Sequence, residues 1–364
     1  MSAVRVPFLR LRPGEDSSAV QAAIARVIER GWFVLGPEVE AFEAEFAAAS
    51  GARYAVGVGN GTDALALTLR ALGVGPGDEV ITSPLSAAYT GLAVLMAGAR
   101  PVFADLDAER LTLDPGATAA AVTPRTAALL PVHLYGQAAD GVALAALAAR
   151  HNLALVEDCC QAHLATCAGR PVGTLGVAGA FSFYPTKNLG ALGDGGAVIT
   201  SDRGLADRVR RLRNGGQSDR YHHVEAGVNS RLDELQAAIL RARLAFLPAW
   251  TERRRRLAAT LTMMLEGAPV TPLPICDSGH VFHLFVVRSP ERDEFQAHLE
   301  ARGIETLIHY PVPLPRQAAF AAVSPAACPV ADRACAEIVS LPFHPDLRED
   351  HRDAVVEGIR SFRG

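Results

Sequence analysis

The chain has 364 residues, of which 49% are hydrophobic and 20% are charged, and its formal net charge is −4. This length predicts two domains, each with its own core. The net charge gives no general attraction to nucleic acid or anionic membranes, so we expect a small-molecule substrate rather than a polyanionic partner. No apolar run is long enough to cross a bilayer.

Two helices are expected near the start of the chain. Residues 17–30 have the apolar spacing of an amphipathic helix, with two serines in front as candidate caps and Gly31 behind. Pro37 begins a second helix, because proline is common in a first helical turn.

A candidate anion site follows. Residues 54–58 are strand-like and lead through the glycine-rich stretch 59–63 into a helix over 64–72. A helix N-terminus after such a turn presents free backbone N–H groups to an anion, and Thr62 adds a hydroxyl. The same glycines resemble a dinucleotide fingerprint, but Thr62 stands where its third glycine belongs, so a Rossmann oxidoreductase is the weaker alternative.

Strands and helices then alternate through residue 158, with strand-like segments near 79, 101 and 127 and an alanine-rich helix over 141–150. This rhythm predicts a mostly parallel sheet covered by helices on both faces. Ligands of such sheets collect at the carboxyl ends of the strands, where Asp158 lies. A functional carboxylate is one interpretation of Asp158, and a helix cap for Gln161 onward is the other.

The stretch Ser182–Gly196 places Lys187 between an aromatic run and a glycine-rich turn. Shelter from water lowers the pKa of a lysine, which is the condition for a nucleophilic amine that condenses with a carbonyl. The alternative is a surface lysine that pairs with Asp194.

Two further features concern cysteines and arginines. Six cysteines without a signal peptide favour free thiols in a reducing cytoplasm. Cys159, Cys160, His163 and Cys167 are grouped like zinc ligands, but the CxxC spacing is missing, so we expect no metal site. Arg253–Arg256 is expected to be the solvated face of a helix.

A long helix is expected from residue 227 onward, and Asn229 or Ser230 would cap it. Beyond residue 245 the composition changes to strands and helices separated by prolines, with a strand-like segment over 305–310. We therefore expect a large cofactor-binding domain over 1–245 and a smaller α+β domain over 246–364.

A nucleophilic lysine, a helix N-terminus for a phosphate and a buried aspartate for a pyridinium nitrogen together meet the needs of pyridoxal phosphate. The sequence also resembles the DegT/DnrJ/EryC1/StrS sugar aminotransferases, a family of fold type I pyridoxal phosphate enzymes. The resemblance runs through 34–40, 59–65, 131–137, 157–158 with 161–163, 182–196, 229–236 and 309–311, whereas Cys159 and Cys160 stand where small residues such as alanine are usual.

The resemblance implies a role for each matching residue. Lys187 would form the Schiff base, Asp158 would bind the ring nitrogen and Gln161 the phenolic oxygen. Gly61, Thr62 and Ser182 would bind the phosphate, and Asn229 would reach the phosphate in the neighbouring subunit of a homodimer with shared sites. Candidate substrate residues are Tyr184, Arg231, His309 and Tyr310.

One departure from the family pattern concerns the ring that usually stacks on the pyridine. Leu85 and Ala87 stand at the positions that usually carry an aromatic or histidine ring. Plain apolar contact from Leu85 or Tyr89 is the expected substitute.

The implied function is transfer of an amino group, from an amino acid such as L-glutamate, to a 3- or 4-keto group of a nucleotide-linked deoxysugar. Two alternatives within the family are a sugar dehydratase and a non-catalytic regulator. Family dehydratases typically lack the lysine, whereas this chain keeps Lys187. A regulator would not need to keep Lys187, Asp158 and Gln161 together.

Overall fold

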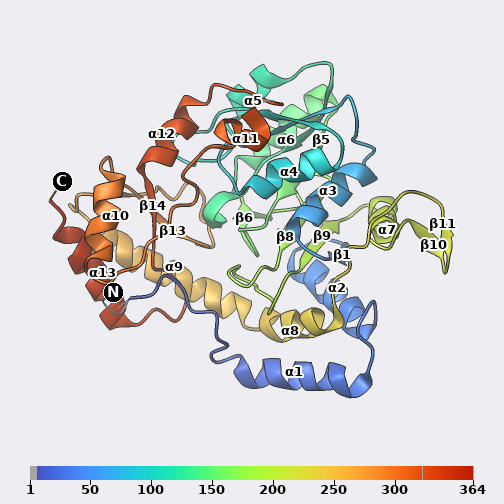
Figure 1. Cartoon of the computed structure of the whole chain (residues 1–364), viewed down its shortest axis with the longest axis horizontal. Coiled ribbons are helices and arrows are strands. Elements are labelled where there is room, and N and C mark those ends of the chain that lie inside the picture. Colours follow the sequence, from blue (N-terminus) through green and yellow to red (C-terminus); the bar gives the residue numbers. More distant parts are fainter. Residues whose placement is uncertain (1–5, 322, 364) are drawn as a thin grey trace.

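The computed structural model describes residues 6–321 and 323–363. Its largest feature is a seven-stranded sheet with the strand order β1-β9-β8-β5-β4-β2-β3 (Figure 1). Neighbouring strands from β3 across to β8 are parallel, whereas β9 is antiparallel to both β8 and β1. The strands are β1 (Tyr54–Val58), β2 (Glu79–Thr82), β3 (Arg100–Phe103), β4 (Thr126–Leu130), β5 (Ala154–Asp158), β8 (Ala178–Ser182) and β9 (Gly196–Thr200). The predicted mostly parallel sheet is confirmed.

Both faces of this sheet are covered by helices, because successive side chains of a strand point to opposite sides. In β9, Val198 belongs to one apolar cluster, and Ala197 and Ile199 belong to another. The first cluster includes side chains of α3 (Gly61–Ala71), α4 (Ala88–Met96) and α7 (Arg203–Leu212). On the other side lie α2 (Pro37–Ala49), α8 (Glu234–Leu244), α5 (Pro115–Ala121) and α6 (Gly141–His151).

The first helix, α1 (Ser17–Arg30), has the predicted bounds and packs on α8. It ends as expected at Gly31, whose φ of 69° is in the left-handed region that favours glycine. The expected serine cap is wrong, because the N-cap residue is Asp16. The Asp16 carboxylate instead accepts from Arg243 Nε at 2.8 Å.

A second layer follows α8 in the chain and contains a three-stranded antiparallel sheet. Its strands are β12 (Thr271–Pro272), β13 (Phe285–Arg288) and β14 (Ile338–Leu341). The helices around it are α9 (Leu247–Met264), α10 (Arg292–Glu300), α11 (Ala318–Ala321), α12 (Pro329–Glu337) and α13 (Glu349–Arg360). The strand predicted over 305–310 is wrong, since only Leu307 forms a bridge, to Ser340, and Pro311 and Pro313 cannot donate to a ladder.

We propose the short link between α8 and α9 as the domain boundary, near the expected residue 245. The start of the chain crosses this boundary, because Val6 forms a bridge with Ile304 of the second layer. Residues 1–5, 322 and 364 of the two expected ranges lie outside the described residues.

The remaining elements are short. They are β6 (Thr166–Cys167), β7 (Arg170–Pro171), β10 (Gln217–Asp219), β11 (His222–His223) and two 3-10 turns at Leu134–Gly136 and Leu314–Arg316. The hairpin of β10 and β11 projects from the body of the molecule (Figure 1). Within the described residues, none of the helices is both long and apolar enough to traverse a bilayer.

Candidate active site

Three expected site residues meet at the carboxyl ends of β5 and β8. Asp158 ends β5, Ser182 ends β8, and Gly61 begins α3. A Cβ atom on Gly61 would lie 2.7 Å from Ser182 Cβ and 2.9 Å from Cys160 Sγ. Helix α3 therefore approaches the sheet at a distance that only glycine allows at this position.

The N-terminus of α3 is arranged for an anion. The Asn60 side chain caps the helix by accepting from Asp63 N at 2.8 Å. The N–H groups of Gly61 and Thr62 lie in the first turn, where a helix offers them no acceptor of its own. With the helix dipole, these amides and the hydroxyls of Thr62 and Ser182 form a set of donors suited to a phosphate.

Asp158 is buried and its carboxylate has two donors. Thr90 Oγ1 in α4 donates to Oδ2 at 2.7 Å, and Cys160 N donates to Oδ1 at 3.1 Å. The helix-cap interpretation of Asp158 is wrong, because residues 159–165 form turns rather than a helix. Thr90 was not among the expected site residues, since 68 positions separate it from Asp158 and only the fold brings them together.

The neighbouring Glu157 anchors the end of β5 from the opposite face. Its two oxygens accept from the backbone N–H groups of Gly173, Leu175 and Gly176 at 2.7–2.9 Å. Its fourth partner is His133 Nε2 at 2.9 Å. Because His133 Nδ1 accepts from Ala139 N, Nε2 carries the proton and donates to the carboxylate. This buried network fixes the strand that carries Asp158.

Lys187 is half-buried on a turn in which its backbone N–H bonds to Tyr184 O at 2.8 Å. Burial lowers the pKa of Lys187, and the nearby Cys160 and Asp158 act in the opposite direction. Conversely, Lys187 contributes to the lowered pKa of His309, which burial brings to about 4. The alternative of a surface lysine paired with Asp194 is wrong, because no ion pair within the described part of the chain joins Lys187 to Asp194.

Lys187 is also the only lysine among the 364 residues, whereas the other basic side chains of fixed charge are arginines. An arginine cannot act as a nucleophilic amine, because its guanidinium stays protonated. The composition of this chain therefore allows lysine chemistry at one side chain only.

Gln161 connects the large sheet with the second layer. Its Oε1 accepts from Tyr135 N at 2.7 Å, and its Nε2 donates to Tyr310 Oη at 3.2 Å. Tyr135 in turn donates its hydroxyl to the backbone oxygen of His309. Since Oε1 is already occupied, the amide nitrogen of Gln161 is the donor that faces the site.

Leu85, Ala87 and Tyr89, the residues considered in place of a stacking ring, differ in their exposure to solvent. Leu85 is 0% exposed and packs in a core cluster with Phe8 and Phe103, so it is not available to cover a cofactor. The expectation of contact from Leu85 is therefore wrong. Ala87 is half-buried at the N-cap of α4, and Tyr89 in its first turn is 63% exposed.

The side chains of three expected site residues, Asn229, Arg231 and Tyr184, do not join this group. Asn229 is exposed and forms a backbone bridge with Asn214, whose side chain accepts from Arg231 Nη1 at 3.2 Å. Tyr184 is also exposed. The helix-cap interpretation of Asn229 and Ser230 is wrong, because α8 begins only at Glu234 with Asp233 as its N-cap residue.

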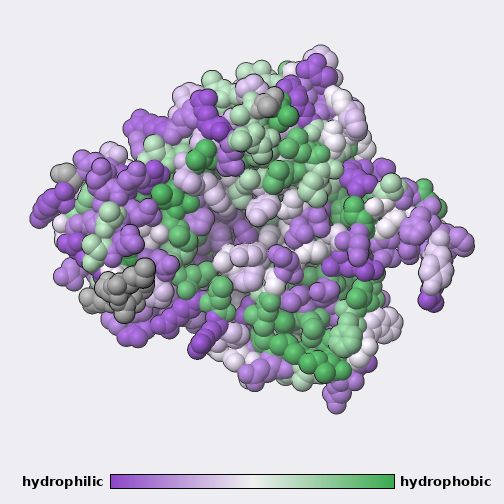
Figure 2. Space-filling view, in the orientation of Figure 1, coloured by the Kyte–Doolittle hydropathy of each residue, from purple (hydrophilic) through white to green (hydrophobic). Residues whose placement is uncertain are grey.

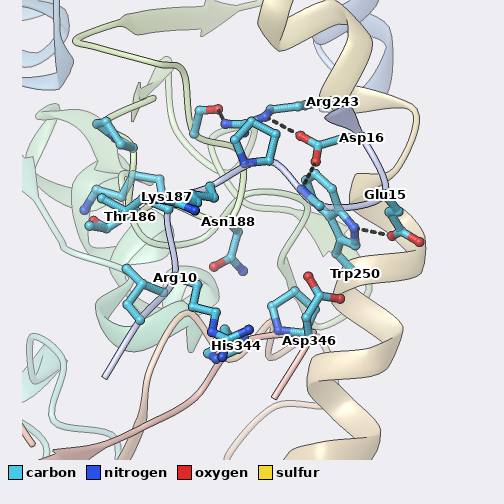
Figure 3. Close-up of a pocket in the computed structure, with 18 of the residues that line it drawn as sticks. Arg10, Glu15, Asp16, Thr186, Lys187, Asn188, Arg243, Trp250, His344 and Asp346 are labelled. Carbon is cyan, nitrogen blue, oxygen red and sulfur yellow. Dashed lines mark hydrogen bonds and ion pairs between the residues drawn. The ribbon is translucent and has the colours of Figure 1, made fainter. Parts of the chain in front are cut away.

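Two cavities border the Lys187 turn. The larger, of about 680 Å³, lies between the N-terminal segment, the Lys187 turn, α9 and the loop at His344 (Figure 3). The smaller, of about 270 Å³, is lined by residues that include His283 and His309. Thr186 lines both, so the two cavities adjoin at the residue before Lys187.

This donor set fits pyridoxal phosphate. The first turn of α3 fits the phosphate, the buried Asp158 carboxylate fits a protonated ring nitrogen, and the second N–H of Gln161 Nε2, beside the one that donates to Tyr310, fits the phenolic oxygen. Lys187, whose pKa is lowered, fits the aldehyde carbon.

Comparisons with known proteins agree with this fit. The chain is 49% identical to dTDP-3-amino-3,4,6-trideoxy-alpha-D-glucose transaminase of Streptomyces venezuelae, with 98% of this chain and 96% of the relative covered. It is 46% identical to the pleiotropic regulatory protein of Geobacillus stearothermophilus, with 99% of each covered. The crystal structure of S. venezuelae DesV in complex with ketimine intermediate superimposes with a TM-score of 0.95, at 49% identity and 98% coverage of each chain.

The model of the DegT/DnrJ/EryC1/StrS aminotransferase family matches residues 15–360. The expected fold type I architecture, pyridoxal phosphate cofactor and aminotransferase class are thereby confirmed. The chain belongs to the DegT/DnrJ/EryC1/StrS aminotransferase family.

Proposed function

We propose that this enzyme transfers an amino group from L-glutamate to a 3- or 4-keto group of a nucleotide-linked deoxysugar. The observation that carries the proposal is the meeting of Lys187, Asp158 and the first turn of α3 at the carboxyl ends of β5 and β8. The S. venezuelae relative, covered almost completely, is named for a 3-amino sugar linked to dTDP.

Lys187 is proposed to hold the cofactor covalently and then to carry the proton. The bound cofactor supplies an electron sink that weakens the Cα–H bond of the substrate. Burial lowers the pKa of Lys187, which favours the neutral amine that can accept that proton. The Asp158 carboxylate, held by Thr90, keeps the ring nitrogen protonated.

Binding of the remaining cofactor groups is assigned to Gly61, Thr62 and Ser182 for the phosphate and to Gln161 for the phenolic oxygen. His309 and Tyr310 are proposed to face the substrate, because both lie beside the Gln161 amide or the Lys187 turn. Tyr184 and Arg231 keep their proposed substrate roles only in an assembly of two chains, since Tyr184 bonds to Ser182 and Lys187 through its backbone alone and Arg231 bonds to Asn214.

A homodimer with shared sites is part of the proposal. Hydrophobic residues gather over α1 and α8 in Figure 2. Ile28 of α1 is 60% exposed, and after α1 Trp32 is 55% and Phe33 48% exposed. Apolar surface of this kind favours association with a second chain. Because Asn229 is exposed and does not cap a helix, we propose that its side chain binds the phosphate of the neighbouring site.

Subunit exchange tests the shared site. Mixing Asn229→Ala with Lys187→Ala should restore part of the activity that each variant lacks, because one site of each hybrid dimer carries both changes and the other carries neither. Mass spectrometry confirms that hybrids form. Hybrids no more active than their parents, or an active monomer, would refute the shared site.

The catalytic proposal is tested with purified enzyme, a panel of keto-sugar nucleotides and L-glutamate. The expected product has the mass of the amino sugar, formed together with 2-oxoglutarate. Loss of a hydroxyl without amine incorporation would identify a dehydratase. No reaction with any keto sugar would favour the regulator, a class that the name of the G. stearothermophilus relative suggests.

The cytoplasm is the proposed compartment. All six cysteines are free, as suits a reducing environment. Fractionation of cells that express the protein from its own promoter tests this assignment.

A further inference from the structure

Arg254 is a buried cation whose surroundings differ from the expectation for its helix. The run Arg253–Arg256 was expected to form a solvated face. In α9 the Arg256 side chain is 65% exposed and pairs with Glu252, as expected. Arg254, in contrast, is only 5% exposed and faces the interior.

The polar contacts of Arg254 leave its charge uncompensated. Its Nη1 donates to the backbone oxygens of Phe282 at 3.1 Å and His283 at 3.4 Å, and its guanidinium carbon lies 5.8 Å from the centre of the Phe343 ring. Its Nε is buried and has no partner among the residues that the structure describes. Within residues 6–321 and 323–363, no carboxylate lies within 4 Å of the guanidinium.

A nearby carboxylate exists but is already engaged. Asp346 interacts with Arg253 at 3.4 Å, and its effect on Arg254 is too weak to offset burial, which lowers the pKa of Arg254 to about 10. A buried charge without a partner is destabilising, and an anion that enters from outside would offset that cost.

The position of Arg254 connects this charge with the active site. Arg254 lines both cavities, together with Thr186, and the larger cavity also includes Lys187. Positive side chains outnumber carboxylates around the larger cavity, where Arg10, Arg12, Lys187, Arg243 and Arg254 face Glu15, Asp16 and Asp346. Moreover, Asp16 is paired with Arg243, and Glu15 accepts from Trp250 (Figure 3).

We propose that Arg254 binds a carboxylate group of the amino donor. This inference rests on the proposed transamination and adds the subsite for its first substrate. The planar guanidinium fork matches a carboxylate, and Nε and Nη2 are the groups left for it. The carboxylate of an amino acid lies one bond from the carbon that reacts beside Lys187, whereas the diphosphate of a nucleotide sugar is separated from its ketone by the sugar ring.

The test uses glutarate, a dicarboxylate without an amino group, so that binding is measured without turnover. Calorimetric titration of the cofactor-loaded enzyme should give affinity for glutarate that falls about tenfold to a hundredfold in Arg254→Met, the range expected for one lost hydrogen bond to a charged group. Arg254→Lys keeps the charge without the fork and should show an intermediate loss. Arg256→Met, on the same helix and solvated, should bind glutarate like wild type.

Two results would overturn the assignment of Arg254 to the donor carboxylate. Failure of wild type to bind glutarate, or equal affinity of wild type and both Arg254 variants, overturns the proposal. A parallel titration with dTDP distinguishes the donor carboxylate from the nucleotide diphosphate as the ligand of Arg254. If the Arg254 variants bound dTDP more weakly and glutarate as well as wild type, Arg254 would be assigned to the diphosphate instead. Since these titrations require no turnover, their failure is distinguishable from an absence of transamination, which would refute the proposed function.

Discussion

The substitution Gly61→Ala tests whether the close contact of α3 with β8 creates the phosphate site. The new Cβ would lie 2.7 Å from Ser182 Cβ, whereas ordinary contact begins at 3.4 Å, so one element must move by about 0.7 Å. Ser182 is held on both sides, because it pairs with Gly196 in the sheet and its backbone oxygen accepts from His163 Nε2 at 2.9 Å. The first turn of α3 must therefore move.

This displacement has two measurable consequences. Overpacking of this kind should lower the free energy of unfolding of the cofactor-free enzyme by about 1–3 kcal/mol, as measured by urea denaturation. The displaced N–H groups of Gly61 and Thr62 should weaken pyridoxal phosphate binding at least about tenfold, as measured by fluorescence titration, because hydrogen bonds to charged groups are among the stronger ones.

Gly75→Ala is the matched control. The nearest atom to its new Cβ is Ala97 O at 3.8 Å, so no displacement is required. Its stability should change by less than about 0.5 kcal/mol, and its cofactor affinity should match wild type. If Gly61→Ala bound pyridoxal phosphate as tightly as Gly75→Ala does, the first turn of α3 would not be the phosphate site.

Further predictions concern the aspartate, its hydroxyl partner and acid stability. Asp158→Asn should reduce turnover strongly and shift the visible absorbance of the bound cofactor, because an amide cannot stabilise a protonated ring nitrogen; unchanged rate and spectrum would contradict its role. Thr90→Val should lower the free energy of unfolding by about 1.5–3 kcal/mol, because the Thr90 hydroxyl donates to a carboxylate. Thr68→Val is the control and should lower it by about 0.5–1.5 kcal/mol, because the Thr68 hydroxyl donates to the neutral backbone oxygen of Ala64. Equal urea midpoints of the two variants would contradict the charge-assisted bond. Burial lowers the pKa of His280 to about 3 and of His344 to about 4, so below about pH 6.5 the unfolded chain binds protons that the folded chain does not bind. The free energy of unfolding should therefore fall as the pH is lowered from about 6.5 to about 4. A free energy that does not change over this range would contradict the burial of neutral imidazoles.

The parts of the fold that could be predicted are those set by local patterns. The helix over 17–30 was predicted with its observed bounds, because its apolar stripe and Gly31 are both local signals. Helix α8 was expected about seven residues too early, since residues 227–233 are held by long-range contacts such as the bridge between Asn214 and Asn229.

The candidate site divides in the same way. Lys187 and Asp158 could be proposed from the sequence, because Asp158 ends an apolar strand and Lys187 lies between an aromatic run and a glycine-rich turn. The bond of Thr90 to Asp158 and the place of Arg254 at the cavities could not be predicted, because both depend on packing between distant elements. Leu85 was misassigned for the related reason that an apolar residue in a loop gives no sign of which core it enters.

The assignment of Lys187 as the residue that holds the cofactor is tested most directly by reduction of the enzyme with borohydride, followed by digestion and mass mapping. Reduction makes the bond between cofactor and amine permanent. Because Lys187 is the only lysine of the chain, the sole other amine able to react is the N-terminal one. We predict that the pyridoxyl group is found on the peptide that contains Lys187; its absence there, or its presence only at the N-terminus, would contradict the assignment.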